Sequence, residues 1–190
     1  MLNEFFNPEQ IKKLDYYKDM LHKWHDKLHL VSDKALADLD THILDCAYLW
    51  PFIKDDPTIV DVGSGNGFPG AVLSIMGAKG ILVDSHKKKV VFLNELVNDL
   101  NLELEVIPHS IRNLRSVRET WIIAKGFGPL EKCLSATSKL WRRNKKGLFI
   151  KSDSVQEEID FALANGWKFD YNICKRYMQG TIVRIENVRS

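Results

Sequence analysis

Near the start of the chain, hydrophobic residues recur every three or four positions, which is the spacing of one face of an α-helix. Asn7 can cap such a helix, Pro8 suits its first position, and Gln10 completes a start like a capping box. The apolar face consists of Ile11, Leu14, Tyr17, Leu21, Trp24 and Leu28. A single apolar face must pack on another body, so this helix is expected to be attached to a larger unit.

A second helix is expected from about Thr41 to Trp50. Asp40 can cap its start, and Pro51 is expected to stop it because proline cannot continue a helix. Together the two elements predict an N-terminal helical extension over residues 1–55.

The acidic stretch Asp55-Asp56-Pro57 is expected to be the boundary, because short β-rich runs then alternate with amphipathic helices. That alternation is typical of a parallel sheet covered on both faces. The predicted strands are Thr58–Val62, Gly80–Asp84, Glu103–Ile107, Trp121–Ala124 and Gly147–Lys151. Two crossover helices are predicted over Lys87–Leu100 and Pro129–Trp141.

The last forty residues follow a different pattern. Asp153 can cap a further helix that Gly166 ends. Two strands, Trp167–Ile173 and Thr181–Glu186, are expected to be joined by a turn near Gln179-Gly180 and to pair antiparallel at the sheet edge. The predicted fold class is therefore α/β, with residues 56–190 forming one Rossmann-like domain around a mostly parallel sheet.

Composition narrows the class of protein. With 45% hydrophobic and 27% charged residues among 190, the chain can bury a substantial core, which excludes a disordered polymer. The longest apolar run, Cys46 to Trp50, is far shorter than the ~20 residues that span a bilayer, so no membrane segment is expected. The first residues lack the pattern of a secretory signal, and three scattered cysteines fit neither a disulfide framework nor a zinc site. A cytoplasmic protein is expected.

The net charge of +2 hides an asymmetry. Residues 1–55 hold seven Lys and Arg against ten Asp and Glu, whereas residues 56–190 hold twenty against fifteen. The basic clusters are Lys87-Lys88-Lys89, then Arg112, Arg115 and Arg118, then Arg142-Arg143-Asn144-Lys145-Lys146. Phosphate backbones attract such clusters, although basic runs are more often solvated faces, so charge alone leaves nucleic-acid binding open.

A glycine-rich loop is the sharpest motif. The predicted strand ending at Val62 runs directly into alternate glycines, Gly63, Gly65 and Gly67. Glycine lets the backbone adopt positive φ and approach a ligand closely. Phe68 stands where a dinucleotide fingerprint needs its third glycine, so NAD and FAD are disfavoured, and no Lys-Ser/Thr pair completes a P-loop. An adenosyl amino acid, which has no pyrophosphate, suits this loop better.

Asp84 ends the second predicted strand, seventeen residues after Gly67. A carboxylate there can accept both ribose hydroxyls of an adenosine at the carboxyl end of the sheet. Loop and acid together favour S-adenosylmethionine as cofactor. The alternative is that glycine loops and strand-end acids are common in α/β proteins whatever those proteins bind.

The chain also resembles a known family over nearly its whole length. The matching segments are Leu21-His-Lys-Trp24, Leu28-His29-Leu30, His42-Ile-Leu-Asp45, Asp61-Val-Gly-Ser-Gly-Asn-Gly-Phe-Pro-Gly70, Val83-Asp-Ser-His-Lys-Lys-Lys-Val-Val-Phe-Leu93, Ile123-Ala-Lys-Gly-Phe127 and Ile150-Lys151. They resemble the bacterial RsmG (GidB) family, which methylates N7 of a guanine in small-subunit ribosomal RNA with S-adenosylmethionine. The resemblance implies the Rossmann-like class I methyltransferase fold, and ribosomal RNA or the small ribosomal subunit as partner.

The resemblance also implies which residues bind the cofactor. Gly63, Gly65 and Phe68 match family positions. The family's adenine-side pair falls on Ser110 and Ile111, without the usual Glu, and the family's Ser-Arg-Ala-Phe segment reads Ala124-Lys125-Gly126-Phe127. The expected cofactor-binding set is Asp61, Gly63, Gly65, Gly67, Phe68, Asp84, Ser110, Ile111 and Lys125.

Guanine N7 carries a free lone pair, so methyl transfer to it needs alignment of the reactants rather than a general base. The expected catalytic residues are Lys125 and Phe127. Lys125 would place positive charge near the cofactor carboxylate or an RNA phosphate, and Phe127 would either stack on a base or belong to the core. Cys133 lies on an apolar helix face and is expected to be core.

No metal site is expected, because His22, His25 and His29, and His42 with Asp45, lack a recognisable metal-binding signature. A monomer is expected. Two other functions stay open: a catalytically silent RNA-binding or ribosome-assembly module of the same fold, motivated by Val31, Ile111 and Lys125, and a methyltransferase for a small molecule or protein.

Overall fold

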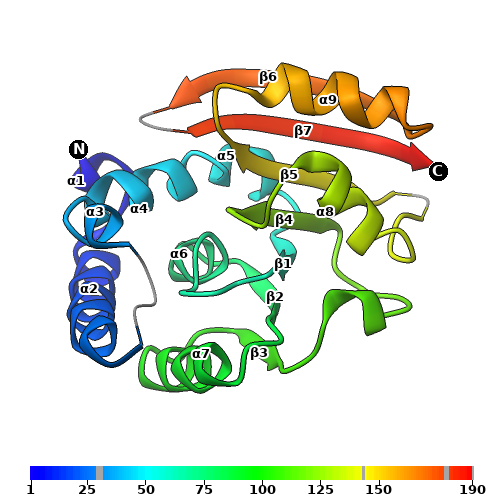
Figure 1. The fold of residues 1–190 in the computed structure, drawn as a ribbon. Coiled ribbons are helices and arrows are strands. Elements are labelled where there is room, and N and C mark those ends of the chain that lie inside the picture. Colours follow the sequence, from blue (N-terminus) through cyan, green and yellow to red (C-terminus); the bar gives the residue numbers. More distant parts are fainter. Residues whose placement is uncertain (29–31, 143, 178–179, 190) are drawn as a thin grey trace.

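A computed structural model describes residues 1–28, 32–142, 144–177 and 180–189 of the chain. In that part the chain forms a seven-stranded sheet with the order β3-β2-β1-β4-β5-β7-β6 (Figure 1). The parallel strands are β1 Thr58–Val62, β2 Lys79–Val83, β3 Leu104–Ile107, β4 Trp121–Lys125 and β5 Lys146–Lys151. Strands β7, Gly180–Arg189, and β6, Lys168–Tyr177, are antiparallel and close the edge beside β5. The predicted α/β class, parallel sheet and antiparallel edge pair are confirmed.

Helices cover both faces of the sheet (Figure 1). Their bounds are α1 Leu2–Phe5, α2 Pro8–Leu28, α3 Asp33–Leu36, α4 Leu39–Ala47, α5 Trp50–Ile53, α6 Gly70–Ile75, α7 Lys87–Asp99, α8 Leu130–Ala136 and α9 Val155–Ala164, with a 3₁₀ turn η1 Ile111–Asn113. Strand β4 shows why the strands read as continuous apolar runs. Its Trp121 and Ile123 belong to one core cluster, whereas Ile122 and Ala124 belong to the other, on the opposite face.

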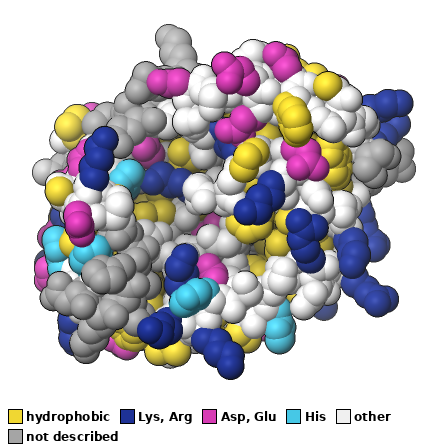
Figure 2. All heavy atoms as spheres, viewed as in Figure 1, with side chains coloured by type: hydrophobic (Ala, Val, Ile, Leu, Met, Phe, Trp, Pro, Cys, Tyr) yellow, Lys and Arg dark blue, Asp and Glu magenta, His cyan; other side chains and the backbone are white. Residues whose placement is uncertain are grey.

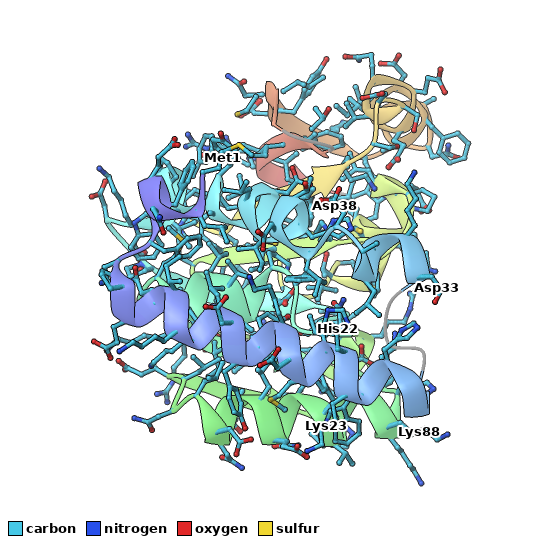
Figure 3. The ribbon with its side chains drawn as sticks, turned by 90° about the vertical axis from the view of Figure 1, so that its left-hand side faces the viewer. Met1, His22, Lys23, Asp33, Asp38 and Lys88 are labelled. Carbon is cyan, nitrogen blue, oxygen red and sulfur yellow. The ribbon has the colours of Figure 1, made fainter. Side chains whose placement is uncertain are left out.

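The N-terminal helices share a core with the sheet domain. Leu14, Tyr17 and Leu21 of α2 are fully buried in the same cluster as Phe68 and Leu96. In Figure 3, α2 lies across the side of the molecule between α4 and α7, with His22 and Lys23 near its end. The predicted capping box is confirmed, since Asn7 and Gln10 exchange backbone-to-side-chain hydrogen bonds of 2.9 Å.

Charge is unevenly spread over the surface (Figure 2). Acidic side chains gather near α9, whereas Lys and Arg side chains gather along the edge that carries α8 and the loops beside it. In the described part of the chain, no helix is both long enough and apolar enough to cross a bilayer.

Several predicted boundaries were wrong. Pro51 does not stop the second helix, which ends at Ala47; it lies in the first turn of the separate helix α5, where the missing N–H costs nothing. Helix α4 begins at Leu39 after Asp38, earlier than predicted, and α8 ends at Ala136 instead of Trp141. Cap residue Ser154, not Asp153, precedes α9. The short helices α1 and α3 were not predicted.

Candidate active site

The glycine loop follows β1 and forms the floor of a trough at the carboxyl ends of the parallel strands. The N–H groups of Gly63 and Ser64 both donate to the carbonyl of Val83, at 2.8 and 3.1 Å, which ties the loop to the end of β2. Gly63, Gly65 and Gly67 all have positive φ, at 70°, 57° and 95°. L-residues rarely adopt this conformation, which explains the alternate glycines.

The three glycines differ in what surrounds them. A Cβ on Gly63 would lie 2.4 Å from the ring of Phe127, and one on Gly67 would lie 2.7 Å from the Tyr17 hydroxyl. A Cβ on Gly65 would meet no protein atom closer than 3.6 Å. Gly63 and Gly67 therefore allow close packing inside the protein, whereas a Cβ on Gly65 would fit in ordinary van der Waals contact with the Gly63 carbonyl oxygen at 3.6 Å and Lys89 Nζ at 3.7 Å.

Asp84 follows β2 and faces the same loop. Its two carboxylate oxygens accept hydrogen bonds from the backbone N–H of Gly65 at 2.9 Å and of His86 at 2.8 Å. Each carboxylate oxygen can accept more than one hydrogen bond, so a partly exposed Asp84 keeps capacity for two hydroxyl donors. The acid is thus held in place with the capacity that a ribose requires.

Asp61 lies beneath the loop rather than in the trough. It is fully buried, and its Oδ2 accepts the N–H of Gly70 at 3.0 Å, which connects β1 to the start of α6. Burial raises the pKa of this carboxyl to about 8, although the hydrogen bonds from Gly70 and Ser64 oppose the shift. This placement assigns Asp61 to positioning the loop instead of touching a ligand.

We expect the Asp61→Asn variant to alter how stability depends on pH. Asp61 stays protonated in the folded chain up to about pH 8, whereas it ionises near 3.8 when unfolded. The wild-type free energy of unfolding should therefore fall relative to the variant as pH rises from 5 to 8, by up to about 1.4 kcal/mol per pH unit. Urea unfolding of both proteins at four pH values measures the difference, and parallel curves would contradict the assignment.

Tyr17 connects α2 to the loop. Its side chain is fully buried, and its hydroxyl donates to the carbonyl of Asn66 at 2.5 Å. Its ring lies 5.4 Å from that of Phe68. The N-terminal helix therefore holds the underside of the glycine loop.

Replacing Tyr17 by Phe should lower the stability of the protein and its affinity for a ligand of the loop. The carbonyl of the partly exposed Asn66 would lose the hydrogen bond from Tyr17, which costs about 0.5–1.5 kcal/mol, or a few degrees in Tm for a chain of this size. The matched control is Tyr16→Phe, because the Tyr16 hydroxyl bonds Asp99 on the exposed surface. Thermal unfolding that treats both variants alike would show that the buried hydroxyl does not anchor the loop.

Three adjacent pockets make up the trough. The Asp84 pocket, of about 290 Å³, includes Gly63, Asp84, Ser110, Ile111 and Phe127. The Gly65 pocket, of about 480 Å³, includes Ser32, His42, Gly65, Phe68 and Lys125. The Asp45 pocket, of about 400 Å³, includes His42, Asp45, Lys125, Ser152 and Gly180. Gly126 lines all three, so the pockets lie next to one another along the carboxyl ends of the strands from β2 to β5.

Lys125 lies where the Gly65 and Asp45 pockets meet. Its Nζ is 2.8 Å from Nδ1 of His42 and 5.3 Å from the centre of the Phe68 ring. Lysine only donates, so Nδ1 of His42 accepts and carries no proton. Burial, and then the Lys125 charge, lowers the pKa of His42 below its usual 6.5, which keeps the imidazole neutral at pH 7.

Phe127 lies at the other end of the trough. Its ring packs on Gly63 and lines the Asp84 pocket, with Lys132 Nζ 5.7 Å from the ring centre. It is half-buried and contacts the core cluster beneath α8. The ring of Phe127 therefore contacts the core and also lines the Asp84 pocket.

The remaining predicted residues divide into two groups. Ser110 and Ile111, at the start of η1, line the Asp84 pocket, and Phe68 lines the Gly65 pocket. Cys133 is buried in α8 and its thiol pKa is raised to about 11, as expected of a core residue. His29 and Val31 lie outside the described residues, and among those described no cluster of His, Cys, Asp or Glu could hold a metal ion.

Some site contacts were not predicted. The loop after β4 is held by Lys151, which donates to the carbonyl of Gly128 and pairs with Glu158. Glu158 in turn accepts the N–H of Leu130 at 2.7 Å. Asp45 accepts the N–H of Gly180 at 3.3 Å, across 135 residues of chain. Contacts between residues so far apart leave no pattern in the sequence, although Ile150-Lys151 is one of the segments that carry the family resemblance.

Comparison with known proteins agrees with this geometry. The family model GidB, described as rRNA small subunit methyltransferase G, matches residues 10–177. The ribosomal RNA small subunit methyltransferase G of Orientia tsutsugamushi (strain Ikeda) is 34% identical over 177 residues, covering 92% of this chain and 88% of the relative. The enzyme of the same name from Paramagnetospirillum magneticum is 33% identical, covering 84% and 78%.

Solved structures confirm the fold. Magnesium protoporphyrin IX methyltransferase from Synechocystis PCC 6803, with bound S-adenosylmethionine, superposes with a TM-score of 0.63 at 14% identity, covering 92% of this chain and 97% of that one. A ribosomal protein L11 methylase from Lactobacillus delbrueckii subsp. bulgaricus gives 0.57 at 18% identity, covering 80% and 78%. The predicted class I methyltransferase fold is therefore confirmed.

Proposed function

Since this chain belongs to the GidB family, rRNA small subunit methyltransferase G, we propose that it transfers a methyl group from S-adenosylmethionine to N7 of a guanine in small-subunit ribosomal RNA. The observation that carries the proposal is the row of adjacent pockets, with a glycine loop and a held carboxylate at one end and a second pocket at the other. A donor and an acceptor can lie in it end to end.

The residues present fit the methyl donor. Asp84 has the lone pairs for the ribose hydroxyls, and Ser110 and Ile111 line the pocket beyond it, where an adenine would lie. The apolar ring of Phe127 forms another wall of that pocket. We therefore assign Phe127 to the adenine side of the trough rather than to the target base. The Gly65 pocket would receive the amino acid part of the donor.

The acceptor base would occupy the Asp45 pocket. This pocket meets the donor side at His42, Lys125 and Gly126. Guanine presents N–H donors on its Watson–Crick edge and acceptors at O6 and N7. The buried carboxylate of Asp45 suits the donor edge, which would leave N7 turned toward the donor pocket.

The proposed methyl transfer requires the protein mainly to place the two reactants relative to each other. S-adenosylmethionine supplies an electrophilic methyl group on its sulfonium sulfur. The trough holds the reactants in line, a contribution that can reach about 7–11 kcal/mol of the barrier. Guanine N7 needs no proton removed, and His42, with Nδ1 accepting from Lys125, serves to fix the ammonium group rather than to act as a base.

A methylation map tests the proposal. Wild-type protein, methyl-labelled S-adenosylmethionine and small-subunit rRNA, naked or in assembled subunits, should yield one labelled guanine. Borohydride reduction followed by aniline should cleave the RNA there, because these reagents open 7-methylguanine. An Asp84→Ala variant should give no label. Absence of label on both substrates, with S-adenosylmethionine still binding, would overturn the proposal in favour of a silent RNA-binding module.

A further inference from the structure

Two basic segments lie side by side along the flank that carries α8. Lys139 Nζ donates to the carbonyl of Arg112 at 3.2 Å, and the Arg142 guanidinium donates to the carbonyl of Arg115 at 3.4 Å. Lys145 Nζ donates to the carbonyl of Arg118 at 3.2 Å and to the carbonyls of Val117 and Glu119. Each Lys or Arg donor stands 27 residues after its arginine partner, so the segments run in register.

These bonds arrange six cations in two adjacent rows, here named the basic band. It consists of Arg112, Arg115, Arg118, Lys139, Arg142 and Lys145. The side chains of Arg112, Arg115 and Arg118 are exposed. Residues 106–118 and 132–152 contain no Asp or Glu. The concentration of Lys and Arg along this edge is visible in Figure 2.

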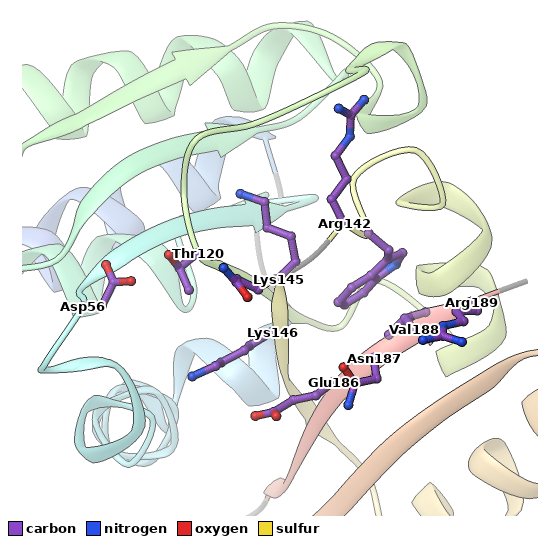
Figure 4. A pocket seen from close by; sticks show the side chains of 11 residues that line it. Asp56, Thr120, Arg142, Lys145, Lys146, Glu186, Asn187, Val188 and Arg189 are labelled. Carbon is purple, nitrogen blue, oxygen red and sulfur yellow. The ribbon is translucent and has the colours of Figure 1, made fainter.

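The band connects two hollows. At one end Arg112 lines the Asp84 pocket, and its guanidinium contacts Ser135 of α8 at 3.5 Å. At the other end a depression of about 750 Å³ opens beside the starts of β4 and β5 (Figure 4). It therefore lies at the amino ends of these strands, whereas the trough lies at the carboxyl ends. The seven residues from Arg112 to Arg118 span at most about 20 Å, long enough to face several successive phosphates.

The far depression carries excess positive charge. Four cations line it, Arg142, Lys145, Lys146 and Arg189, against the two acids Asp56 and Glu186. Figure 4 shows Lys145 and Lys146 at the start of β5 and Arg189 at the end of β7. Glu186 is paired with Arg184, which is not part of the lining, so its charge is already compensated.

We infer that the basic band and this depression bind the phosphodiester backbone of an RNA segment that continues from the target base to the far edge of the sheet. The inference rests on the proposed function, which supplies the RNA. Lys139, Arg142 and Lys145 are held by bonds to backbone carbonyls and are already ordered, so attracting phosphates by their charge costs them little further conformational entropy. The exposed Arg112, Arg115 and Arg118 have guanidinium groups that can bond the phosphates directly. An acidic protein surface is the competing partner, and the band's start at the donor pocket favours RNA.

The test compares two double variants that each remove two exposed cations. Arg115→Gln/Arg118→Gln changes the band. Lys12→Gln/Lys23→Gln is the control, because both lysines are exposed on α2, eleven residues apart and so on one helix face, on the other side of the molecule. Binding of the full chain to naked small-subunit rRNA and to assembled small subunits is measured over a range of KCl concentrations, with S-adenosylmethionine affinity and wild-type methyl transfer measured in parallel.

The band variant should lose about two from the slope of log K against log[KCl], one for each lost phosphate contact, and bind more weakly at every salt concentration. The control should keep the wild-type slope, and both should bind S-adenosylmethionine normally. A band slope equal to the control's overturns the inference. So does normal binding to naked rRNA with loss on assembled subunits, which would indicate a protein partner. Failure of wild-type methyl transfer would instead reject the proposed function.

Discussion

A Gly65→Val variant should fold and yet lose S-adenosylmethionine binding by more than about a hundredfold, roughly 2.7 kcal/mol or more. The φ of 57° disfavours a β-branched residue at this position. The larger effect comes from space, since Gly65 lines the Gly65 pocket and the new Cβ would contact two other parts of that lining, the Gly63 carbonyl oxygen at 3.6 Å and Lys89 Nζ at 3.7 Å. The added methyl groups would therefore occupy the volume that the donor needs. Isothermal titration with S-adenosylmethionine measures the loss.

Gly166→Val separates backbone strain from lost space. Gly166 also has positive φ, at 91°, and a Cβ there would meet nothing within 4 Å. It follows α9, away from the trough, so its variant carries strain without entering the pocket. We expect the two variants to lose similar stability in thermal unfolding while only Gly65→Val loses affinity. Near-normal binding of S-adenosylmethionine by Gly65→Val would show that the glycine loop is not part of the donor site.

The fold was largely predictable because its signals are local. The run from Thr58 to Val62 is rich in β-branched residues and is followed directly by Gly63, so both ends of β1 are predicted correctly. Pro51 misled the prediction because proline is compatible both with the end of one helix and with the first turn of the next. The predicted helix over Pro129–Trp141 is too long because the apolar spacing continues to Leu140 and Trp141. In the structure α8 ends at Ala136, and these two residues pack on the core from a non-helical segment.

The site was predictable only in part, because several of its contacts join segments that lie far apart in the sequence. Gly65 and Asp84 stand in motifs whose spacing reveals them, and the structure joins them by one hydrogen bond. The bond from Tyr17 to Asn66 and the bond from Gly180 to Asp45 join segments far apart in sequence, and no periodicity marks either one. A single sequence can identify candidate ligand-binding residues from their type and spacing. It does not identify the distant residues that hold those candidates in position.

Replacing Lys125 by Met should lower kcat/KM for rRNA methylation by about 10- to 150-fold, the equivalent of one charged hydrogen bond of 1.5–3 kcal/mol. Lys125 lines both the Gly65 and the Asp45 pockets, which are proposed to hold the donor and the acceptor, and its Nζ lies 2.8 Å from Nδ1 of His42. Methionine keeps the length and the apolar stem but has no charge. Lys125→Arg retains the cation and should keep at least a tenth of wild-type activity. Steady-state kinetics with both substrates varied measures these effects.

The same variant decides what the ammonium group serves. If it binds the cofactor carboxylate, KM for S-adenosylmethionine should rise in Lys125→Met, whereas a role toward an RNA phosphate should raise KM for RNA alone. A purely structural role would move neither constant selectively. The pKa of His42, followed by NMR, gives an independent readout: Lys125 lowers it, so it should rise toward 6.5 in Lys125→Met and stay low in Lys125→Arg. Wild-type kcat/KM together with an unmoved His42 pKa would exclude Lys125 from the reaction.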